Sequence, residues 1–193
     1  MNSFKHQYIK LKLQEEFFNK IKDEINHSQH FDVNGEKIDK SQLQPGLVIS
    51  GIDSRRKCKL SYLSNQKLDG LVNGLVTLAN EKCGWNLDIN YIEPIQYTVY
   101  ESGDFYDWHI DEDEWTPNKR SNGRIRKVSF TIVLDSDFEG GDFLLEVNGN
   151  PRTFNLTERS CIIFFSDALH KVSPVTSGVR KSLVGWAQGP AFK

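Results

Sequence analysis

Residues 106–111 read Tyr-Asp-Trp-His-Ile-Asp, and this run carries the strongest indication of how the chain folds. On a β-strand, residues two apart point to the same face, so His109 and Asp111 would aim an imidazole and a carboxylate at one point. Residues 167–172, Asp-Ala-Leu-His-Lys-Val, supply His170 as a second imidazole from a distant strand. Two histidines and one carboxylate occupy one face of an octahedral Fe(II) ion and leave its other positions open. The sequence therefore predicts a metal site between β-strands.

Arg180 stands ten residues after His170, in the run Gly-Val-Arg-Lys-Ser-Leu at residues 178–183. An iron site of this kind needs an electron source to activate O2, and the usual source is 2-oxoglutarate, which chelates the metal through its keto acid end. Its far carboxylate then needs a fixed cation, and arginine binds a carboxylate through two hydrogen bonds while staying charged. Ser182 would face the same side of a strand as Arg180. We therefore predict that Arg180, with Ser182 beside it, binds 2-oxoglutarate.

Short strand candidates separated by turns follow one another from residue 88 onward. Apart from the strand with the metal ligands, they are residues 92–100, 127–134, 142–147, 152–156, 160–165, 171–175 and 181–188. Gly140-Gly141 predicts a tight turn and Asn148-Gly149 a hairpin. Residues 112–123 predict a long loop at the mouth of the site, with Asp113 as a weak substitute ligand. Regularly spaced short strands indicate a β-sandwich or barrel.

The first ninety residues show a different pattern. Apolar residues recur at helical spacing in residues 9–27 and again in 65–82, where Gly84 follows as a helix stop. Residues 28–46 are polar and predict loop and short turns, and residues 47–52 are a short strand candidate. This half therefore predicts two helices that flank the β-rich half.

Composition and charge are those of an ordinary globular chain. The chain has 193 residues, which is enough for one domain with a core, and 38% of them are hydrophobic and 26% charged. We predict a single domain over residues 1–193, with a helical support region at 1–88 and a β core at 89–193. The formal net charge of −2 argues against general nucleic-acid binding, which normally needs a basic surface.

The chain carries no apolar run of membrane-spanning length and no hydrophobic signal region at its start. Cys58, Cys83 and Cys161 match neither a disulfide framework nor a zinc site, and Cys161 lies in an apolar run typical of a core. These features predict a cytoplasmic protein without a membrane partner. They leave its oligomeric state open.

Four motifs together resemble those of the Fe(II)/2-oxoglutarate-dependent oxygenases. They are H-x-D at 109–111, E-G-G-D-F at 139–143, F-F-S-D-x-x-H-x-V-x-P-V at 164–175 and G-x-R-x-S-L-x-x-W at 178–186. Within that superfamily the chain looks most like the prolyl 4-hydroxylase-like group, including its small bacterial and phage members. The resemblance covers about residues 90–190 and is specific for the superfamily rather than for a substrate.

The resemblance implies a mainly β (α+β) fold: a double-stranded β-helix, or jelly roll, with the metal in its mouth and N-terminal helices beside it. It implies Fe(II), 2-oxoglutarate and O2, with ascorbate as a candidate accessory. In prolyl 4-hydroxylases a tyrosine at the spacing of Tyr100 helps bind 2-oxoglutarate, and one at the spacing of Tyr106 lies by the substrate. Collagen-type enzymes commonly have lysine where this chain has Arg180, so the arginine indicates a different branch.

Two further residues are candidates for substrate contact. Trp186, six residues after Arg180, could wall the pocket and stack on a proline ring, and a tryptophan of the core would give the same pattern. Arg126, just before the strand candidate at 127–134, could reach the substrate or be a solvated strand-edge arginine.

Several functions remain open from the sequence. The leading interpretation is hydroxylation of a prolyl residue in a peptide or protein, with release of succinate and CO2. The chain is short and shows no separate peptide-binding domain, so a free amino acid or another small metabolite is the alternative substrate. A nucleic-acid demethylase of the AlkB kind would have a second arginine where Trp186 stands. A non-enzymatic cupin-like metal-binding or sensor module would lack Arg180 and Ser182, and a zinc hydrolase would need a general base in a helix motif with its histidines.

Overall fold

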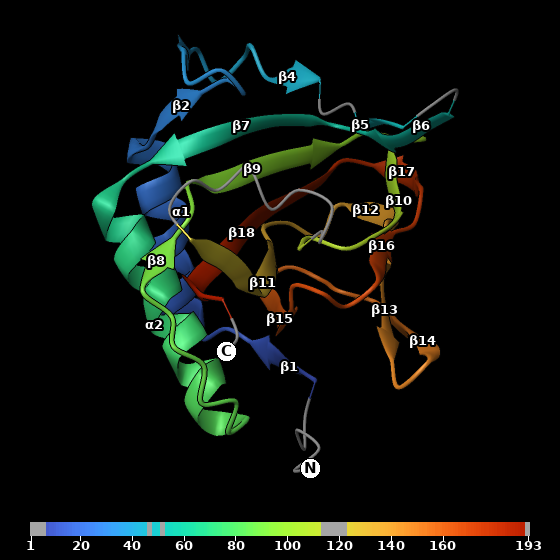
Figure 1. Ribbon diagram of the computed structural model, residues 1–193. Coiled ribbons are helices and arrows are strands. Elements are labelled where there is room, and N and C mark those ends of the chain that lie inside the picture. Colours follow the sequence, from blue (N-terminus) through green and yellow to red (C-terminus); the bar gives the residue numbers. More distant parts are fainter. Residues whose placement is uncertain (1–6, 46–47, 51–52, 113–122, 192–193) are drawn as a thin grey trace.

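The fold consists of two facing β-sheets, with two helices on the outer face of the larger sheet (Figure 1). It is known from a computed structural model that describes residues 7–45, 48–50, 53–112 and 123–191. All strand pairs in this part of the chain are antiparallel. This arrangement is the mainly β jelly roll that the family resemblance implies, within the sandwich or barrel class that the strand spacing predicts.

The strands of the larger sheet follow the order β1 (Tyr8–Lys12), β15 (Ser160–Phe165), β11 (Arg124–Val133), β18 (Arg180–Pro190), β9 (Ile95–Tyr100), β7 (Lys59–Ser64), β2 (Gln29–Phe31) and β3 (Lys37–Ile38). Two short strands join it at its sides, β4 (Gln44–Pro45) on β7 and β8 (Tyr91–Ile92) on β18. The smaller sheet follows the order β14 (Asn150–Phe154), β13 (Phe143–Val147), β16 (His170–Val172), β10 (Phe105–His109), β6 (Asp53–Lys57) and β5 (Val48–Ser50). A separate pair is formed by β12 (Phe138–Gly140) and β17 (Val175–Gly178).

The period of two along each strand separates two apolar clusters, one on each face of the larger sheet. In β15, Cys161 and Ile163 pack toward the helices, whereas Ile162 and Phe164 pack toward the smaller sheet. All four side chains are at most 2% exposed. Each fully buried side chain of this size contributes roughly 1.5–3 kcal/mol relative to an exposed one. The face of the larger sheet that is turned toward the smaller sheet also forms one wall of the space between the two sheets.

The two helices bury one face each against the larger sheet. Helix α1 (Glu15–His27) buries Phe18, Ile21 and Ile25, which recur at helical spacing. Helix α2 (Gln66–Lys82) begins at Asn65, whose side chain accepts hydrogen bonds from the backbone N–H groups of the next turn. None of the helices in the described part of the chain is both long and apolar enough to cross a membrane.

The helix expected over residues 9–27 begins later than predicted. Residues 8–12 form β1, which pairs with β15 in register from Tyr8 opposite Phe164 to Lys12 opposite Ser160. Ile9 and Leu11 alternate with Lys10 and Lys12, a period of two that suits a strand covering the edge of a sheet. The helical prediction was wrong here because hydrogen bonding to a distant strand overrides the local pattern.

Other boundaries differ by smaller amounts. Residues 28–46, expected as loop, contain the short strands β2, β3 and β4, which exist through their pairing with one another and with β7. Strand β11 begins at residue 124 rather than 127. Most of the expected mouth loop, residues 113–122 with Asp113, lies outside the described residues.

Candidate active site

Three predicted ligands come together at one end of the smaller sheet. His109 is the last residue of β10 and His170 the first of β16, and the two face each other in the antiparallel register. Asp111 does not share the strand of His109, so that part of the prediction was wrong. The chain leaves β10 after His109, and the backbone N–H of Asp111 donates to Ser166 O over 2.9 Å. This turn still brings the carboxylate to the imidazoles.

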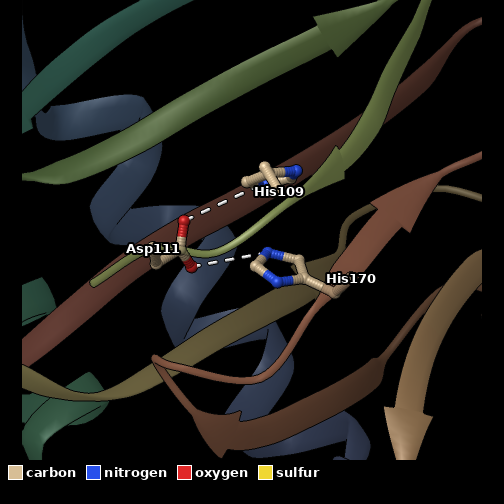
Figure 2. A group of neighbouring side chains, drawn as sticks. All are labelled: His109, Asp111 and His170. Carbon is tan, nitrogen blue, oxygen red and sulfur yellow. Dashed lines mark ion pairs between the residues drawn. The ribbon is translucent and has the colours of Figure 1, made fainter. Parts of the chain in front are cut away.

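The three side chains point into a common space, as Figure 2 shows. Asp111 Oδ1 lies 3.7 Å from His109 Nε2, and Asp111 Oδ2 lies 3.4 Å from His170 Nε2. The candidate ligand atoms all lie within 4.8 Å of one another. Metal bonds of about 2.0–2.2 Å would require only small side-chain movements to bring all three to one ion.

The histidines are oriented so that both Nε2 atoms are available. His109 Nδ1 lies 2.7 Å from Asp107 O, and His170 Nδ1 lies 2.9 Å from Ala168 O. A carbonyl can only accept, so in the neutral ring Nδ1 carries the hydrogen and Nε2 keeps its lone pair. Burial, reinforced by the neighbouring His170, lowers the pKa of His109 to about 3. Neutral imidazole is the form that binds a metal, so these residues fit an iron site.

Asp111 is buried and held in its ionised form. Burial favours the neutral acid, but the two histidines, with smaller contributions from the nearby Ser129 and Trp186, hold the pKa of Asp111 below its usual range. The Trp186 indole N–H forms no hydrogen bond of normal geometry with any described residue, although it lies near this carboxylate. The site therefore offers one carboxylate and two neutral nitrogens, the donor set expected for Fe(II).

Arg180 lies on β18 opposite Tyr100 of β9 and points into the space between the sheets. Its side chain is 1% exposed, and its Nη1 donates to Ser182 Oγ over 3.1 Å. Its Nε and Nη2 are buried without a partner among the described residues. Burial lowers the pKa of this guanidinium because an unpaired cation is costly away from water. A carboxylate would satisfy both free donors, so the site fits the far end of 2-oxoglutarate.

All nine predicted site residues line one cavity of about 420 Å³. They are His109, Asp111, His170, Arg180, Tyr100, Ser182, Tyr106, Trp186 and Arg126. Alternate residues of β18 lie along it, since Arg180, Ser182 and Trp186 all face the same side of that strand. The ring of Tyr106 stacks on that of His109, with centroids 3.4 Å apart and planes at 11°. The structure thus brings these residues together, and their individual roles stay predictions.

Arg126 is held by neighbours within the protein. Its Nε and Nη2 donate to the two oxygens of Glu93 over 2.6 and 2.5 Å, and its Nη1 donates to Asp111 O over 3.1 Å. Its guanidinium also lies over the ring of Trp186, 3.9 Å from the centroid. The side chain thereby connects Glu93, the metal-ligand turn and the Trp186 wall, a role that the sequence did not indicate.

Sequence reasoning missed Arg56 on β6, which also lines the cavity and is only 8% exposed. It lies within the basic run Arg55-Arg56-Lys57, which usually indicates a solvated strand. One signal was present: Arg56 and Cys58 alternate with exposed residues, so Arg56 shares the inward face. Nothing in the sequence showed which sheet this face would meet.

Residues 95–188 match the sequence model of the 2OG-Fe(II) oxygenase superfamily. A PKHD-type hydroxylase of Idiomarina loihiensis is 35% identical over 91 residues, which are 46% of this chain and 39% of that protein. A PKHD-type hydroxylase of Synechococcus sp. is 34% identical over 102 residues, 52% of this chain and 43% of that protein. The aligned part of the chain thus corresponds to less than half the length of these curated relatives.

Solved structures share the fold over nearly the whole chain. A Pseudomonas putida prolyl-4-hydroxylase superimposes with a TM-score of 0.69 and 18% identity, covering 97% of this chain and 95% of that one. A viral collagen prolyl hydroxylase from Paramecium Bursaria Chlorella virus-1 gives 0.67 and 16%, covering 96% and 97%. Residues 95–188, which the superfamily model matches, include His109, Asp111, His170 and Arg180 of the cavity. Residues 95–188 of this chain therefore match the 2OG-Fe(II) oxygenase superfamily, on a jelly roll similar to those of the prolyl hydroxylase structures.

Proposed function

We propose that this chain is an Fe(II)- and 2-oxoglutarate-dependent dioxygenase that hydroxylates a C–H bond of a prolyl residue in a peptide or protein. One observation carries the proposal. The same cavity holds a His-Asp-His group that can bind a metal and a buried arginine with two unpaired donors. A metal site alone would suit many proteins. The added arginine selects a metal protein whose co-substrate has a carboxylate remote from the metal.

Each residue has a distinct task in this proposal. His109, Asp111 and His170 hold Fe(II) through two nitrogens and one oxygen, and Arg180 with Ser182 binds the far carboxylate of 2-oxoglutarate. When bound, iron and 2-oxoglutarate activate O2 and supply the oxidation, with succinate and CO2 as co-products. The protein positions these groups and keeps water from them, as the buried Phe143 and Phe164 rings beside His170 support. No side-chain acid or base is required.

The prolyl substrate is supported by the aromatic side chains at the cavity. Tyr106 covers one face of His109, and Trp186 lies on the other sheet beside Asp111. A ring of proline can pack between such surfaces. Ile110, between two of the metal ligands, is 40% exposed and offers apolar surface at the rim for a longer substrate. A solved relative from Trichoplax adhaerens is a prolyl hydroxylase in complex with a peptide fragment, with a TM-score of 0.62.

We further propose that the enzyme works in the cytoplasm. All three cysteines are buried, and none forms a disulfide within the described part of the chain, which agrees with a reducing compartment. Ascorbate would then serve as an accessory reductant, which an assay with and without it would test.

The test couples succinate formation to a mass shift on the substrate. Purified protein is given Fe(II), 2-oxoglutarate and either proline-containing peptides or free amino acids. Succinate should require Fe(II), and a peptide should gain 16 mass units, the mass of one oxygen atom. The variant His109→Ala should form no succinate, while His27→Ala, at an exposed position of α1, should behave as wild type. Wild-type turnover by His109→Ala would refute the metal assignment.

The other interpretations of the sequence are outcomes of the same experiment. Oxidation of a free amino acid or metabolite, with all peptides unchanged, would replace the prolyl assignment and keep the dioxygenase. Tight binding of metal without any 2-oxoglutarate binding or turnover would instead indicate a cupin-like binding module.

A further inference from the structure

A second hollow adjoins the active-site cavity, and we call it the β7 groove. It has a volume of about 490 Å³ and lies where β2, β7, β8 and the first turn of α2 meet. Tyr62 of β7 lines both the groove and the active-site cavity. Neither the metal ligands nor Arg180 are among the described residues that line the groove, so the chemistry at the metal does not account for it.

The register of the larger sheet shows how the two spaces connect. Phe31 of β2 lies opposite Tyr62, and Tyr62 lies opposite Gln96 of β9. Gln96 in turn lies opposite Val184 of β18. Residues directly opposite each other on neighbouring strands share a face, so these side chains form one row across the sheet. Gln96 and Val184 line the cavity and Phe31 lines the β7 groove, so the face that carries the site continues into the groove.

Glu93 provides a second link between the two spaces. It lines the β7 groove, and its carboxylate accepts two hydrogen bonds from Arg126, which lines the cavity. Arg126 Nη1 donates in turn to the backbone carbonyl of Asp111 over 3.1 Å. A ligand in the groove would therefore lie against the wall that holds the metal-ligand turn.

The groove presents apolar side chains that remain exposed. Val33 and Tyr91 line it and are 60% and 41% exposed, the two highest values among the large apolar side chains of the described residues. Phe31 and Tyr62 are half-buried beside them. Exposed apolar side chains gathered in one hollow favour contact with the apolar part of a ligand.

The charge of the groove is negative. Asp32, Asp69 and Glu93 line it, and its described lining includes no basic residue. Arg126 neutralises Glu93 through an ion pair. The hydrogen bonds that Asp32 accepts come from uncharged groups, namely the backbone N–H groups of residues 34 and 36 and the Asn34 amide. They leave the negative charge of Asp32 in place.

Asp69 faces the groove without a cation beside it. Its side chain forms no ion pair or hydrogen bond within the described ranges, and burial raises its pKa. Two basic residues adjoin the groove without lining it, Arg124 over the Tyr91 ring at 5.3 Å and Lys37 opposite Phe31. A long basic side chain matches both features of the groove, because its aliphatic stem packs on apolar surface while its charged end reaches a carboxylate.

We propose that the β7 groove is a second substrate subsite, which takes a lysine or arginine side chain of the peptide whose prolyl residue lies in the active-site cavity. The spacing follows from the sheet. Neighbouring strands lie about 4.8 Å apart, so β7 and β2 lie about 10 and 14 Å from β18, a distance that an extended peptide covers in about three or four residues. The inference rests on the proposed function, since it names the class of peptide that the same site takes.

The test measures peptide binding and peptide oxidation separately. Fluorescently labelled peptides carry one proline and, about four or about eight residues from it on either side, a lysine, a leucine or a glutamate. Anisotropy follows their binding to the Fe(II) protein with 2-oxoglutarate and without O2, and mass spectrometry follows their oxidation. Lysine at about four residues should lower Kd and KM about fivefold relative to leucine, the effect of one partly exposed ion pair, with kcat unchanged. Lysine at about eight residues should give no such gain.

Variants of Asp69 distinguish a charge-reading subsite from a structural role. Asp69→Asn should reduce the lysine preference to below twofold, and Asp69→Lys should reverse it, so that the glutamate peptide binds more tightly than the lysine peptide. Asp23→Asn, at an exposed position of α1, is the matched control and should keep the full preference. Circular dichroism checks that each variant is folded, and if Asp69→Lys does not fold, the result for Asp69→Asn decides.

The outcomes separate this inference from the proposed function. Equal binding of the three peptides by the wild type, or an unchanged lysine preference in Asp69→Asn, would overturn the subsite. If the peptides were then still oxidised at proline, the proposed function would stand. Binding with the expected charge preference but without oxidation would refute the prolyl substrate and support the subsite.

Discussion

Gly141 lies directly against Arg180, and replacing it with alanine should damage the co-substrate site from outside the cavity. An added Cβ would lie 2.8 Å from Arg180 Cδ and 3.1 Å from Val175 Cγ2. Gly141 also has φ +61°, a conformation that costs other residues roughly 1–2 kcal/mol. The overlap should add the roughly 1–3 kcal/mol typical of overpacking. Gly141→Ala should therefore lose about 2–5 kcal/mol of unfolding free energy.

The matched control is Gly149→Ala in the hairpin between β13 and β14. Gly149 has φ +77°, and an added Cβ there would meet nothing within 4 Å. This variant carries only the backbone cost of roughly 1–2 kcal/mol. The difference between the two variants therefore isolates the contact with Arg180 and Val175. Urea denaturation followed by circular dichroism measures both, with the same slope expected for each.

Gly141→Ala should also weaken the binding of the far carboxylate of 2-oxoglutarate. Displacing Arg180 Cδ should break at least one of the charge-assisted hydrogen bonds to 2-oxoglutarate, each worth about 1.5–3 kcal/mol. Since about 1.4 kcal/mol is tenfold in affinity, the Kd for 2-oxoglutarate should rise at least tenfold in Gly141→Ala and stay unchanged in Gly149→Ala. Equal stability losses in the two variants, with wild-type affinity in both, would refute the reasoning.

Three further predictions concern the support of the site. Asn65→Ala removes the cap of α2 and should cost about 1 kcal/mol of unfolding free energy with no change in 2-oxoglutarate affinity; an unchanged urea midpoint would contradict this. Leu145→Ala, at a fully buried position between the sheets, should lower the free energy of unfolding by about 2–5 kcal/mol. A loss below about 1 kcal/mol would contradict this and would mean that neighbouring side chains fill the space left by the leucine. Glu93→Gln weakens the ion pair with Arg126, whose Nη1 donates a hydrogen bond to the Asp111 carbonyl. We therefore expect kcat to fall while the affinity for 2-oxoglutarate is retained. Unchanged kcat there would mean that the Glu93–Arg126 pair does not support the metal-ligand turn.

Alternation and motif spacing were informative because β-strands impose a period of two. That period by itself predicts that Arg180, Ser182 and Trp186 share one face of a strand, and all three line the cavity. The strand expected at residues 160–165 has the bounds of β15. The local pattern gave a wrong secondary structure where a segment pairs with a distant strand. Residues 8–12, expected to be helical, form a strand that pairs with β15.

The partners of charged side chains could not be predicted in the same way. Arg126 appeared as a candidate for substrate contact, yet Glu93, 33 residues earlier in the chain, holds its guanidinium. Asp111 was expected on the strand of His109, and a turn fixed by Ser166 brings it to the same point instead. Such contacts depend on which loops and strands meet in space.

The chemical groups of the site and their spacing along the chain follow from the amino-acid sequence alone. Two imidazoles, one carboxylate and a late arginine are side-chain properties, and a period of two is a property of each strand. Packing between distant strands sets β6 beside β10, which places Arg56 against the Tyr106 ring, and it encloses Arg180 between two sheets with donors that lack a partner among the described residues. The physical reason is that ligand identity is local, whereas burial and hydrogen-bond direction arise from packing between distant segments.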